Sequence, residues 1–369
     1  MKCSSIMAKG IEKILRLENG SKVNVLRVKY HYLQQLFWEC TLRCNLKCKH
    51  CGSNCTAEDS RGEMPLTDFL QVLDEIRKNM SHPILVITTG GEPLMRKDIM
   101  VCGREITKRG FYWGMVTNGT YLTTKVLNSL LDAGLNSISV SLDGLQNEHN
   151  WMRGSLNSFK AAINAIDILA QTQRCLTWDV ITCINKYNIE HLEELKQLLI
   201  EHGVTRWKIF TVFPMGRAEE FSEMDLDKEN FIRLMTFISE SRKEAAIKVS
   251  YGCENFLGQF EYEVRDNQYF CAAGVNVASI RFDGSISGCL SIRYNYNEGN
   301  IYKDSFVETW NNCFQQYRNY LWKKKGVCTS CEAWRWCQGN GMHLRDDNGN
   351  LKLCNYQKIY HDKNNNYKI

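Results

Sequence analysis

Short apolar runs alternate along this chain with longer segments in which apolar residues recur at helical spacing. Leu70, Leu73 and Ile76, for example, share one side of a helix, as in helices that cover a sheet. The apolar runs are rich in β-branched and aromatic residues, which favours strands. Strands are predicted at residues 36–40, 84–88, 113–117, 137–142, 177–183 and 207–213. Helices are predicted at residues 67–78, 97–108, 123–133, 157–170, 189–201 and 227–243.

Six strand-helix units in series predict a parallel sheet, because parallel neighbours need a long crossover connection and a helix supplies it. Such a sheet either stays open with helices on both faces or closes toward a barrel. The predicted fold class is therefore α/β. In both arrangements the chemistry lies at the carboxyl ends of the strands.

The hydrophobic pattern divides the chain into four parts. Residues 1–34 form an N-terminal leader, in which one strand is predicted at residues 22–29. Residues 35–246 carry the strand-helix units. Over residues 247–357 short strands, glycines, asparagines and cysteines replace the helical pattern, which predicts a separate, smaller, metal-tied domain. Residues 358–369 are a polar tail that we expect to fray.

Composition narrows the cellular setting. No run approaches the roughly 18 apolar residues of a membrane span. Lys9, Glu12 and Lys13 interrupt any signal-peptide core near the start. The net charge of +5, from 46 basic and 41 acidic residues, is too small to argue for nucleic acid. We therefore expect a cytoplasmic protein with neither a membrane nor a nucleic-acid partner.

Seventeen cysteines are too many and too clustered for incidental core thiols. In a reducing compartment, metal ligation by thiolates is favoured over disulfides. Cys44, Cys48 and Cys51 form a C-x3-C-x2-C loop after the first strand. Three thiolates on a short loop can hold three corners of a four-iron four-sulfur cluster and leave the fourth iron open to a substrate. A zinc knuckle or structural thiols are the alternatives, but a zinc site usually takes four ligands, and no fourth lies at the usual close spacing.

The motif Thr89-Gly90-Gly91-Glu92-Pro93 ends the second predicted strand. Glycines let the backbone approach closely, and a carboxylate suits a cation. An ordinary turn with an exposed glutamate would explain this motif if it stood alone. Together with the cysteine loop, it resembles the GGE motif of the radical SAM enzymes, and the resemblance extends over residues 36–217. It implies that the cysteine loop binds a [4Fe–4S] cluster whose open iron chelates the amino and carboxylate groups of S-adenosylmethionine.

The resemblance also implies where S-adenosylmethionine lies. The GGE motif meets the methionine ammonium, and His50 packs near the adenine. Arg153 meets the methionine carboxylate, with an ordinary surface ion pair as the alternative. Alternation along the fourth strand and its end points two serines and an aspartate to one face, where they could receive ribose and methionine groups. The implied cofactor-binding residues are Gly90, Gly91, Glu92, Asn118, Ser139, Ser141, Asp143, Arg153 and His50.

The C-terminal cysteines resemble the SPASM extension of radical SAM enzymes, which holds up to two auxiliary iron-sulfur clusters. In that family the four positions from Cys328 to Cys354 hold the distal cluster; a zinc ribbon is the alternative. The family pattern expects one more cysteine where this chain has Gly341, so the proximal cluster would draw on Cys271, Cys289 and the upstream Cys253. We expect one or two auxiliary clusters. The implied metal ligands are Cys44, Cys48, Cys51, Cys253, Cys271, Cys289, Cys328, Cys331, Cys337 and Cys354.

These motifs imply a partial (β/α)6 TIM-like barrel with a smaller C-terminal cysteine-rich iron-sulfur domain. The implied activity is reductive cleavage of S-adenosylmethionine to a 5'-deoxyadenosyl radical that abstracts hydrogen from a peptide or protein side chain. A flavodoxin- or ferredoxin-type protein is the expected reductant. Formylglycine formation, as in sulfatase maturases, is the runner-up, which Leu290 weakens because those enzymes carry an aspartate there. The alternative from another class is a non-catalytic iron-sulfur electron carrier or a zinc-stabilised binding module.

Overall fold

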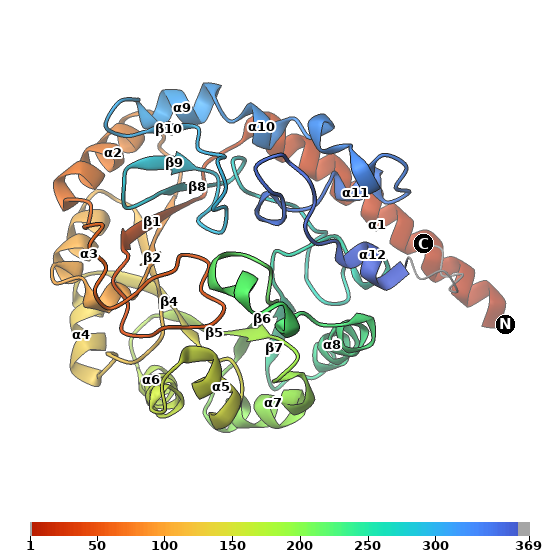
Figure 1. Cartoon of the computed structure of the whole chain (residues 1–369), viewed down its shortest axis with the longest axis horizontal. Helices are drawn as coiled ribbons and strands as arrows, with labels where there is room; N and C mark the ends of the chain where they lie inside the picture. The colour runs from red at the N-terminus through yellow and green to blue at the C-terminus, as the bar shows by residue number, and fades with distance from the viewer. Residues whose placement is uncertain (1, 361–369) are drawn as a thin grey trace.

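The computed structural model describes residues 2–360, with side chains from residue 11 onward except that of Ser222. At its centre lies one ten-stranded sheet with the strand order β10-β9-β8-β1-β2-β3-β4-β5-β6-β7 (Figure 1). The pairings from β8 through β1 to β7 are all parallel. The strands are β1 Gln35–Thr41, β2 Leu85–Gly90, β3 Tyr112–Thr117, β4 Leu135–Ser141, β5 Thr177–Ile184, β6 Arg206–Thr211, β7 Lys248–Tyr251, β8 Val277–Ile280, β9 Ser285–Ser287 and β10 Gly299–Asn300. The first six confirm the six predicted strands.

Helices cover the outside of this curved sheet (Figure 1). They are α2 Leu66–Asn79, α3 Ile99–Lys108, α4 Thr124–Asp132, α5 Gln146–Arg153, α6 Ser158–Gln171, α7 Leu192–Glu201 and α8 Lys228–Ser241. All of these except α5 correspond to predicted helices, and the first turn of the predicted helix at residues 189–201 is the 3-10 helix Ile189–His191. The prediction of an α/β fold with alternating strands and helices is confirmed.

Aromatic residues on alternate strand positions fasten the helices to the sheet. Trp38 of β1 is fully buried and stacks on Phe69 of α2 with the ring centroids 4.0 Å apart. Trp113 of β3 lies against Gly103 of α3, where a Cβ atom would come 2.0 Å from the indole ring. Alternation then turns the intervening residues of each strand to the other face, which is the inner wall of the barrel.

The inner wall carries polar side chains. Ser139 of β4 lies in register with Asp179 of β5, and Ile181 of β5 lies in register with Lys208 of β6. These side chains are only partly buried, whereas their strand neighbours that face the helices are buried. A polar, partly accessible inner wall beside an apolar outer face gives the barrel an interior that can receive a substrate.

The C-terminal part of the chain extends the same sheet at both edges. The predicted domain boundary at residue 247 falls directly before β7, which pairs with β6 from Arg206↔Lys248 to Ile209↔Tyr251. At the opposite edge β8 pairs with β1 over four positions, and β9 and β10 follow in antiparallel order. Residues 247–357 therefore contribute strands to the barrel as well as a separate cysteine-rich region.

The prediction of a strand at residues 22–29 is wrong, because these residues belong to helix α1 Lys2–Tyr30. The alternation of apolar and polar residues there resembles a strand, but Val23 and Val25 are both exposed and Asn24 is buried. Leu17 is fully buried, and Glu18 accepts a hydrogen bond from Trp336 Nε1 at 3.1 Å. Packing on the C-terminal region thus overrides the local pattern, and Figure 1 shows α1 running along that region.

Short elements complete the C-terminal region. They are α9 Phe306–Asn312, α10 Gln315–Arg318, α11 Trp334–Cys337 and α12 Asn355–Tyr360, with 3-10 helices Leu321–Lys323, Gly326–Cys328 and Met342–Leu344 among them. The predicted polar tail begins inside α12, and its residues from 361 onward lie outside the described part of the chain. Of the helices in residues 2–360, none is long and apolar enough to span a membrane.

Candidate active site

The three cysteines of the first motif lie on the loop between β1 and α2, at the carboxyl ends of the strands. The Cys44 N–H donates to the Thr56 carbonyl at 2.8 Å, which closes the loop at its base. Inside the loop the Cys51 N–H donates to the Cys48 carbonyl at 3.3 Å. Burial raises the pKa of the Cys44 thiol to about 12 and also raises that of Cys48. A buried thiolate is stable only beside positive charge, so this donor set suits a metal cluster.

The Gly90-Gly91 turn at the end of β2 packs directly against the start of this loop. Gly90 has a φ of +123°, and a Cβ atom there would lie 2.3 Å from the Thr41 carbonyl oxygen. A Cβ atom on Gly91 would lie 2.2 Å from the Arg43 carbonyl oxygen. The Gly91 N–H and the Glu92 N–H donate to these two carbonyls at 2.8 and 2.9 Å. Glycine is therefore required at both positions for the turn and the cysteine loop to meet.

The Glu92 carboxylate has different partners from those the resemblance implies. It accepts hydrogen bonds from the Thr117 hydroxyl at 2.7 Å, from the Asn118 N–H at 2.8 Å and from the Leu94 N–H at 3.2 Å. Its side chain is buried, and burial raises the pKa of the carboxyl although these donors oppose the shift. Glu92 thus joins the end of β2 to the end of β3. Asn118 in turn donates to the Asn45 side-chain oxygen at 2.9 Å and lies 4.0 Å from Cys44 Sγ.

Asp143, Arg153 and His50 lie together beside the cysteine loop. Arg153 is buried, which excludes the surface ion pair, and its Nε is 2.7 Å from Asp143 Oδ2. Arg153 Nη1 also lies 3.7 Å from Cys48 Sγ. Burial disfavours the charged acid, but Arg153 together with His50, His149 and the Cys183 N–H outweighs it and holds the pKa of Asp143 below its ordinary value. His50 Nε2 is 3.8 Å from the same Asp143 oxygen. Asp143 therefore orients a guanidinium next to the cluster loop.

His149 is a buried residue of this site whose role the sequence motif did not reveal. Its Nδ1 accepts a hydrogen bond from the Asp143 N–H at 2.9 Å. Burial, helped by the nearby Arg153 charge, lowers the pKa of His149 to about 3, so the ring stays neutral and remains an acceptor. The remaining Asp143 oxygen accepts from the Cys183 N–H at 2.9 Å. The end of β4 is thus tied to both α5 and β5.

The two predicted serines line the inner wall close to this group. Ser139 and Ser141 are half-buried residues of β4, two positions apart on one face, as alternation predicted. Ser141 lies in register with Ile181 of β5. Their hydroxyls face the interior of the barrel on the same wall as Asp179.

Arg217 is a site residue that the sequence analysis did not identify. It follows β6, and its Nε donates to the Cys48 carbonyl at 2.7 Å while its Nη1 donates to the Cys55 carbonyl at 3.1 Å. The Arg217 backbone N–H also donates to the Cys51 carbonyl at 3.1 Å. The loops after β1 and β6 therefore lie side by side (Figure 1). The only sequence signal for this contact is the segment Pro214-Met215-Gly216-Arg217-Ala218 after the sixth predicted strand, which by itself indicates only a turn.

The four cysteines from Cys328 to Cys354, called here the distal set, gather around a small pocket in the C-terminal region. The Asn340 side chain bridges two of them: the Cys337 thiol donates to Oδ1 at 3.2 Å, and Nδ2 lies 3.5 Å from Cys354 Sγ. Arg345 is fully buried, and its Nη2 is 3.8 Å from Cys328 Sγ. The predicted ligands of the distal cluster are thus brought together and surrounded by N–H donors.

Cys253, Cys271 and Cys289, called here the proximal set, form a second group. Burial raises the pKa of the Cys253 thiol to about 12, and Cys289 and Cys271 add to this shift. Gly341 lies beside this region, where a Cβ atom would come 2.6 Å from the His343 ring and 3.2 Å from the Tyr269 hydroxyl. A fourth thiol at position 341 has no room without movement of that ring.

A single metal ion fits neither set as it stands. Among residues 2–360, no three His, Cys, Asp or Glu side chains converge closely enough to hold one ion. A zinc ion needs its sulfur ligands about 2.3 Å from one point. A four-iron cluster binds each thiolate at a different iron, so its ligands stand further apart.

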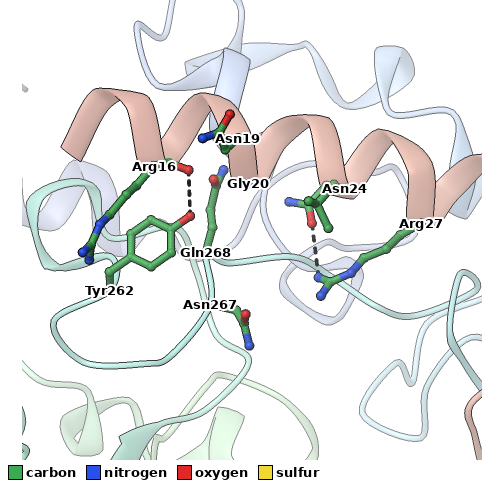
Figure 2. A pocket seen from close by; sticks show the side chains of 9 residues that line it. Arg16, Asn19, Gly20, Asn24, Arg27, Tyr262, Asn267 and Gln268 are labelled. Atoms are coloured by element: carbon green, nitrogen blue, oxygen red, sulfur yellow. Dashed lines mark hydrogen bonds between the residues drawn. The ribbon is translucent and has the colours of Figure 1, made fainter. Parts of the chain in front are cut away.

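A cavity of about 250 Å³ lies between α1 and the segment 262–268 (Figure 2). Arg16 and Arg27 stand at its two ends on α1, and the Tyr262 hydroxyl donates to the Arg16 carbonyl at 2.8 Å. Gly20 lets the two segments meet, because a Cβ atom there would lie 2.2 Å from the Gln268 side-chain oxygen. This cavity belongs to the docking of α1 and shares no residue with the candidate active site.

A curved parallel α/β sheet with a three-cysteine loop, a double-glycine turn and a buried arginine at its carboxyl edge defines a class of iron-sulfur enzymes that use S-adenosylmethionine. Residues 38–199 match the Radical SAM superfamily, and residues 271–332 match the SPASM iron-sulfur cluster-binding domain. The chain belongs to the radical SAM superfamily and carries a SPASM domain.

Comparison with known proteins gives relatives of this architecture. The AdoMet-dependent heme synthase of Methanosarcina barkeri is 28% identical over 320 residues, which cover 82% of this chain and 89% of that protein. Streptococcus suis SuiB bound to its precursor peptide SuiA superposes with a TM-score of 0.64 at 18% identity, over 86% of this chain and 74% of SuiB. The enzyme anSMEcpe, bound to AdoMet and the Cp18Cys peptide, superposes with a TM-score of 0.68 at 19% identity, over 88% and 94% of the two chains. The chain is therefore an enzyme of this superfamily, and the non-catalytic carrier is set aside.

Proposed function

We propose that this enzyme abstracts a hydrogen atom from a side chain of a peptide or protein substrate held inside the barrel. The observation that carries the proposal is the convergence of three elements at one edge of the sheet. These are the cysteine loop, the double-glycine turn and the buried Asp143–Arg153 pair. The partly accessible polar wall formed by β4, β5 and β6 lies next to them.

The residues have separate tasks in this proposal. When bound by Cys44, Cys48 and Cys51, the cluster and S-adenosylmethionine supply a carbon radical that takes hydrogen from an unactivated carbon. Arg153 offers a planar guanidinium to a carboxylate group, and Asp143 fixes its orientation. Ser141 offers a hydroxyl to the ribose.

The charges of the inner wall support a peptide over a carboxylate-rich substrate. Lys208 Nζ lies 3.5 Å from Asp179 Oδ2, and Arg293 Nη1 lies 2.8 Å from Glu39 Oε1. Each of these cations has its charge balanced by an acid, which leaves little net positive charge there to attract a substrate with several carboxylates. The two structures of the same fold described above hold peptides, which agrees with this assignment.

A tetrapyrrole is the second candidate substrate, because five relatives are named for tetrapyrrole products: three AdoMet-dependent heme synthases, an Fe-coproporphyrin III synthase and a pre-heme d1 synthase. Tetrapyrroles carry several carboxylates, and the paired cations of the inner wall argue against them. Formylglycine formation receives less support, because Leu290 is buried and offers no proton acceptor. A flavodoxin- or ferredoxin-type reductant stays a prediction.

Cofactor cleavage is tested with anaerobically reconstituted protein and a strong reductant. We expect conversion of S-adenosylmethionine to 5'-deoxyadenosine and methionine, and its loss when Cys44, Cys48 and Cys51 are all replaced by Ala. Replacement of the unassigned, exposed Cys175 by Ala is the control and should leave the rate unchanged. Turnover at the wild-type rate in the triple variant would contradict the assignment.

Substrate class is tested by what stimulates 5'-deoxyadenosine release. A peptide fraction from the source cells should raise the rate, and digestion of that fraction with a protease should remove the effect. An iron porphyrin with free propionates serves as the competing substrate. Stimulation by the porphyrin alone would replace the peptide proposal with the tetrapyrrole one.

A further inference from the structure

Lys323 is a buried cation without a partner. It ends the 3-10 helix Leu321–Lys323, and its side chain is fully buried. Its Nζ has no hydrogen-bond partner among the residues that the structure describes. It contacts the ring of Tyr320, whose centroid is 4.8 Å from Nζ. A buried ammonium is costly without a negative charge nearby, so a permanent anion at this position would explain why the chain keeps it.

Lys323 lies beside the pocket of the distal set: a Cβ atom on Gly339, which lines that pocket, would come 2.8 Å from Lys323 Cβ. The cysteine charges that act on Lys323 come from both sets. Burial lowers the pKa of Lys323 to about 8, and the charges of Cys271, Cys337 and Cys328 oppose that shift. Cys271 belongs to the proximal set, whereas the other two belong to the distal set. The second buried cation nearby, Arg345, repels Lys323 and therefore adds to the need for negative charge.

Two tyrosine hydroxyls add to this group of unpartnered donors. The buried hydroxyls of Tyr269 and Tyr320 have no hydrogen-bond partner among the described residues. Cys271 acts on the ionisation of both phenols, which places them near the proximal set. Three buried donors that lack an acceptor among the described residues point to an acceptor with several lone pairs and negative charge. The sulfurs of an anionic iron-sulfur cluster have these properties.

We propose that Lys323 is the shared counter-cation of two auxiliary clusters, one on the distal set and one on the proximal set, and that its charge raises their reduction potentials. Reduction adds one negative charge to a cluster, and a nearby ammonium stabilises the reduced form more than the oxidised form. Lys323 acts through this field and is a positioning residue. The proposal requires both auxiliary clusters but does not depend on the substrate.

The test uses full-length protein in which Cys44, Cys48 and Cys51 are replaced by Ala, so that only auxiliary clusters remain. Iron and sulfide are counted after anaerobic reconstitution, and midpoint potentials are measured by a redox titration followed by electron paramagnetic resonance. Lys323→Met removes the charge at similar volume. Lys324→Met is the matched control, because Lys324 is the exposed neighbour. Lys323→Arg keeps the charge.

Two clusters of about four irons each give about eight irons in this background. We expect Lys323→Met to shift the reduction equilibrium of at least one cluster about tenfold toward the oxidised form, which is about 59 mV for one electron. Lys324→Met should leave the potentials unchanged, and Lys323→Arg should stay near the parent. If Lys323→Met loses a cluster that Lys323→Arg retains, the need for charge is supported as well.

The proposal is overturned by equal potentials in the Lys323→Met and Lys324→Met variants. It is also overturned by an iron content of about four in the parent, since the proximal cluster would then be absent, or by loss of clusters in Lys323→Arg and Lys323→Met alike. No S-adenosylmethionine or substrate enters these measurements. A failed substrate assay would therefore contradict the proposed function and leave this result standing.

Discussion

The two buried acids of the candidate site, Glu92 and Asp143, hold neighbouring elements in place. The sequence motifs correctly singled out Glu92 and Asp143, but the partners of these acids come from β3, α5 and β5. Partners of this kind depend on how distant segments pack, which spacing along the chain does not encode. Residue types at strand ends were therefore predictable, whereas the Arg217 clamp and the His149 acceptor were not.

Replacement of Glu92 by Ala tests whether this acid is structural. Two internal donors, the Thr117 hydroxyl and the Asn118 N–H, would lose their acceptor. We expect a loss of about 1–3 kcal/mol in the free energy of unfolding for each donor left unsatisfied in the interior. Denaturant unfolding of the reconstituted protein without S-adenosylmethionine measures it.

Glu58→Ala, at an exposed acid, is the control for Glu92 and should change stability little. If Glu92 acts only on the methionine ammonium, Glu92→Ala will instead leave stability unchanged and weaken cofactor binding alone. The two outcomes separate the packing role that the hydrogen bonds indicate from the role that the resemblance implies.

His149 predicts a pH dependence of stability. Its pKa is about 3 in the folded protein and about 6.5 in an unfolded chain, so the unfolded state binds the extra proton as pH falls. The free energy of unfolding therefore falls by about 2 kcal/mol between pH 7 and pH 5 because of this one group. His149→Asn keeps an acceptor but does not titrate, and its stability should fall less over the same range. Denaturant unfolding at each pH measures this change in stability. An equal fall in stability in wild type and His149→Asn would show that this ring is not the cause.

At the scale of elements, the strand-helix alternation was readable because each helix presents one apolar side to the sheet. The strand prediction at residues 22–29 is wrong because there the local pattern does not match the packing. Val23 and Val25 of α1 follow a strand-like pattern, yet the helix is held by contacts with the distant α11 and with residues 262–268. The helix α5 was also missed, because it is short and carries Asp143's buried partners rather than an apolar stripe.

The contact between the β2 turn and the cysteine loop predicts the effect of Gly91→Ala. The new methyl group would lie 2.2 Å from the Arg43 carbonyl oxygen, so the two segments must separate. We expect a loss of roughly 1–3 kcal/mol in stability, together with a lower iron content at the cysteine loop. Gly52→Ala is the matched control in the same loop, because its nearest atom, on Met215, is 3.9 Å away. Equal iron content and melting temperature in the two variants would show that the close approach is dispensable.

At the scale of the whole molecule, the sheet continues across the predicted boundary at residue 247. Cysteine spacing and glycine content mark the change in composition there, and composition predicts a separate domain. Hydrogen bonding between strands instead crosses this point at both edges of the sheet. The pairing of β1 with β8, which begins at Gln35↔Val277, joins distant parts of the chain and leaves no mark in the local pattern, so the sequence analysis could not predict it.

The continuous sheet predicts that the barrel does not fold without the C-terminal region. A chain ending at residue 246 would lose β7 from one edge and would free β1, whose backbone now pairs with β8 from Gln35↔Val277 to Trp38↔Ile280. It would also uncover the side of β1 that Ile280 and Ala278, both fully buried, now protect. We expect this shortened chain to aggregate through its open strand edges and to show no cooperative thermal transition. A chain ending at residue 360 is the control and should melt like the full protein. Size-exclusion chromatography and thermal unfolding by circular dichroism measure both, and a monomeric, cooperatively melting 1–246 chain would establish two independent domains instead.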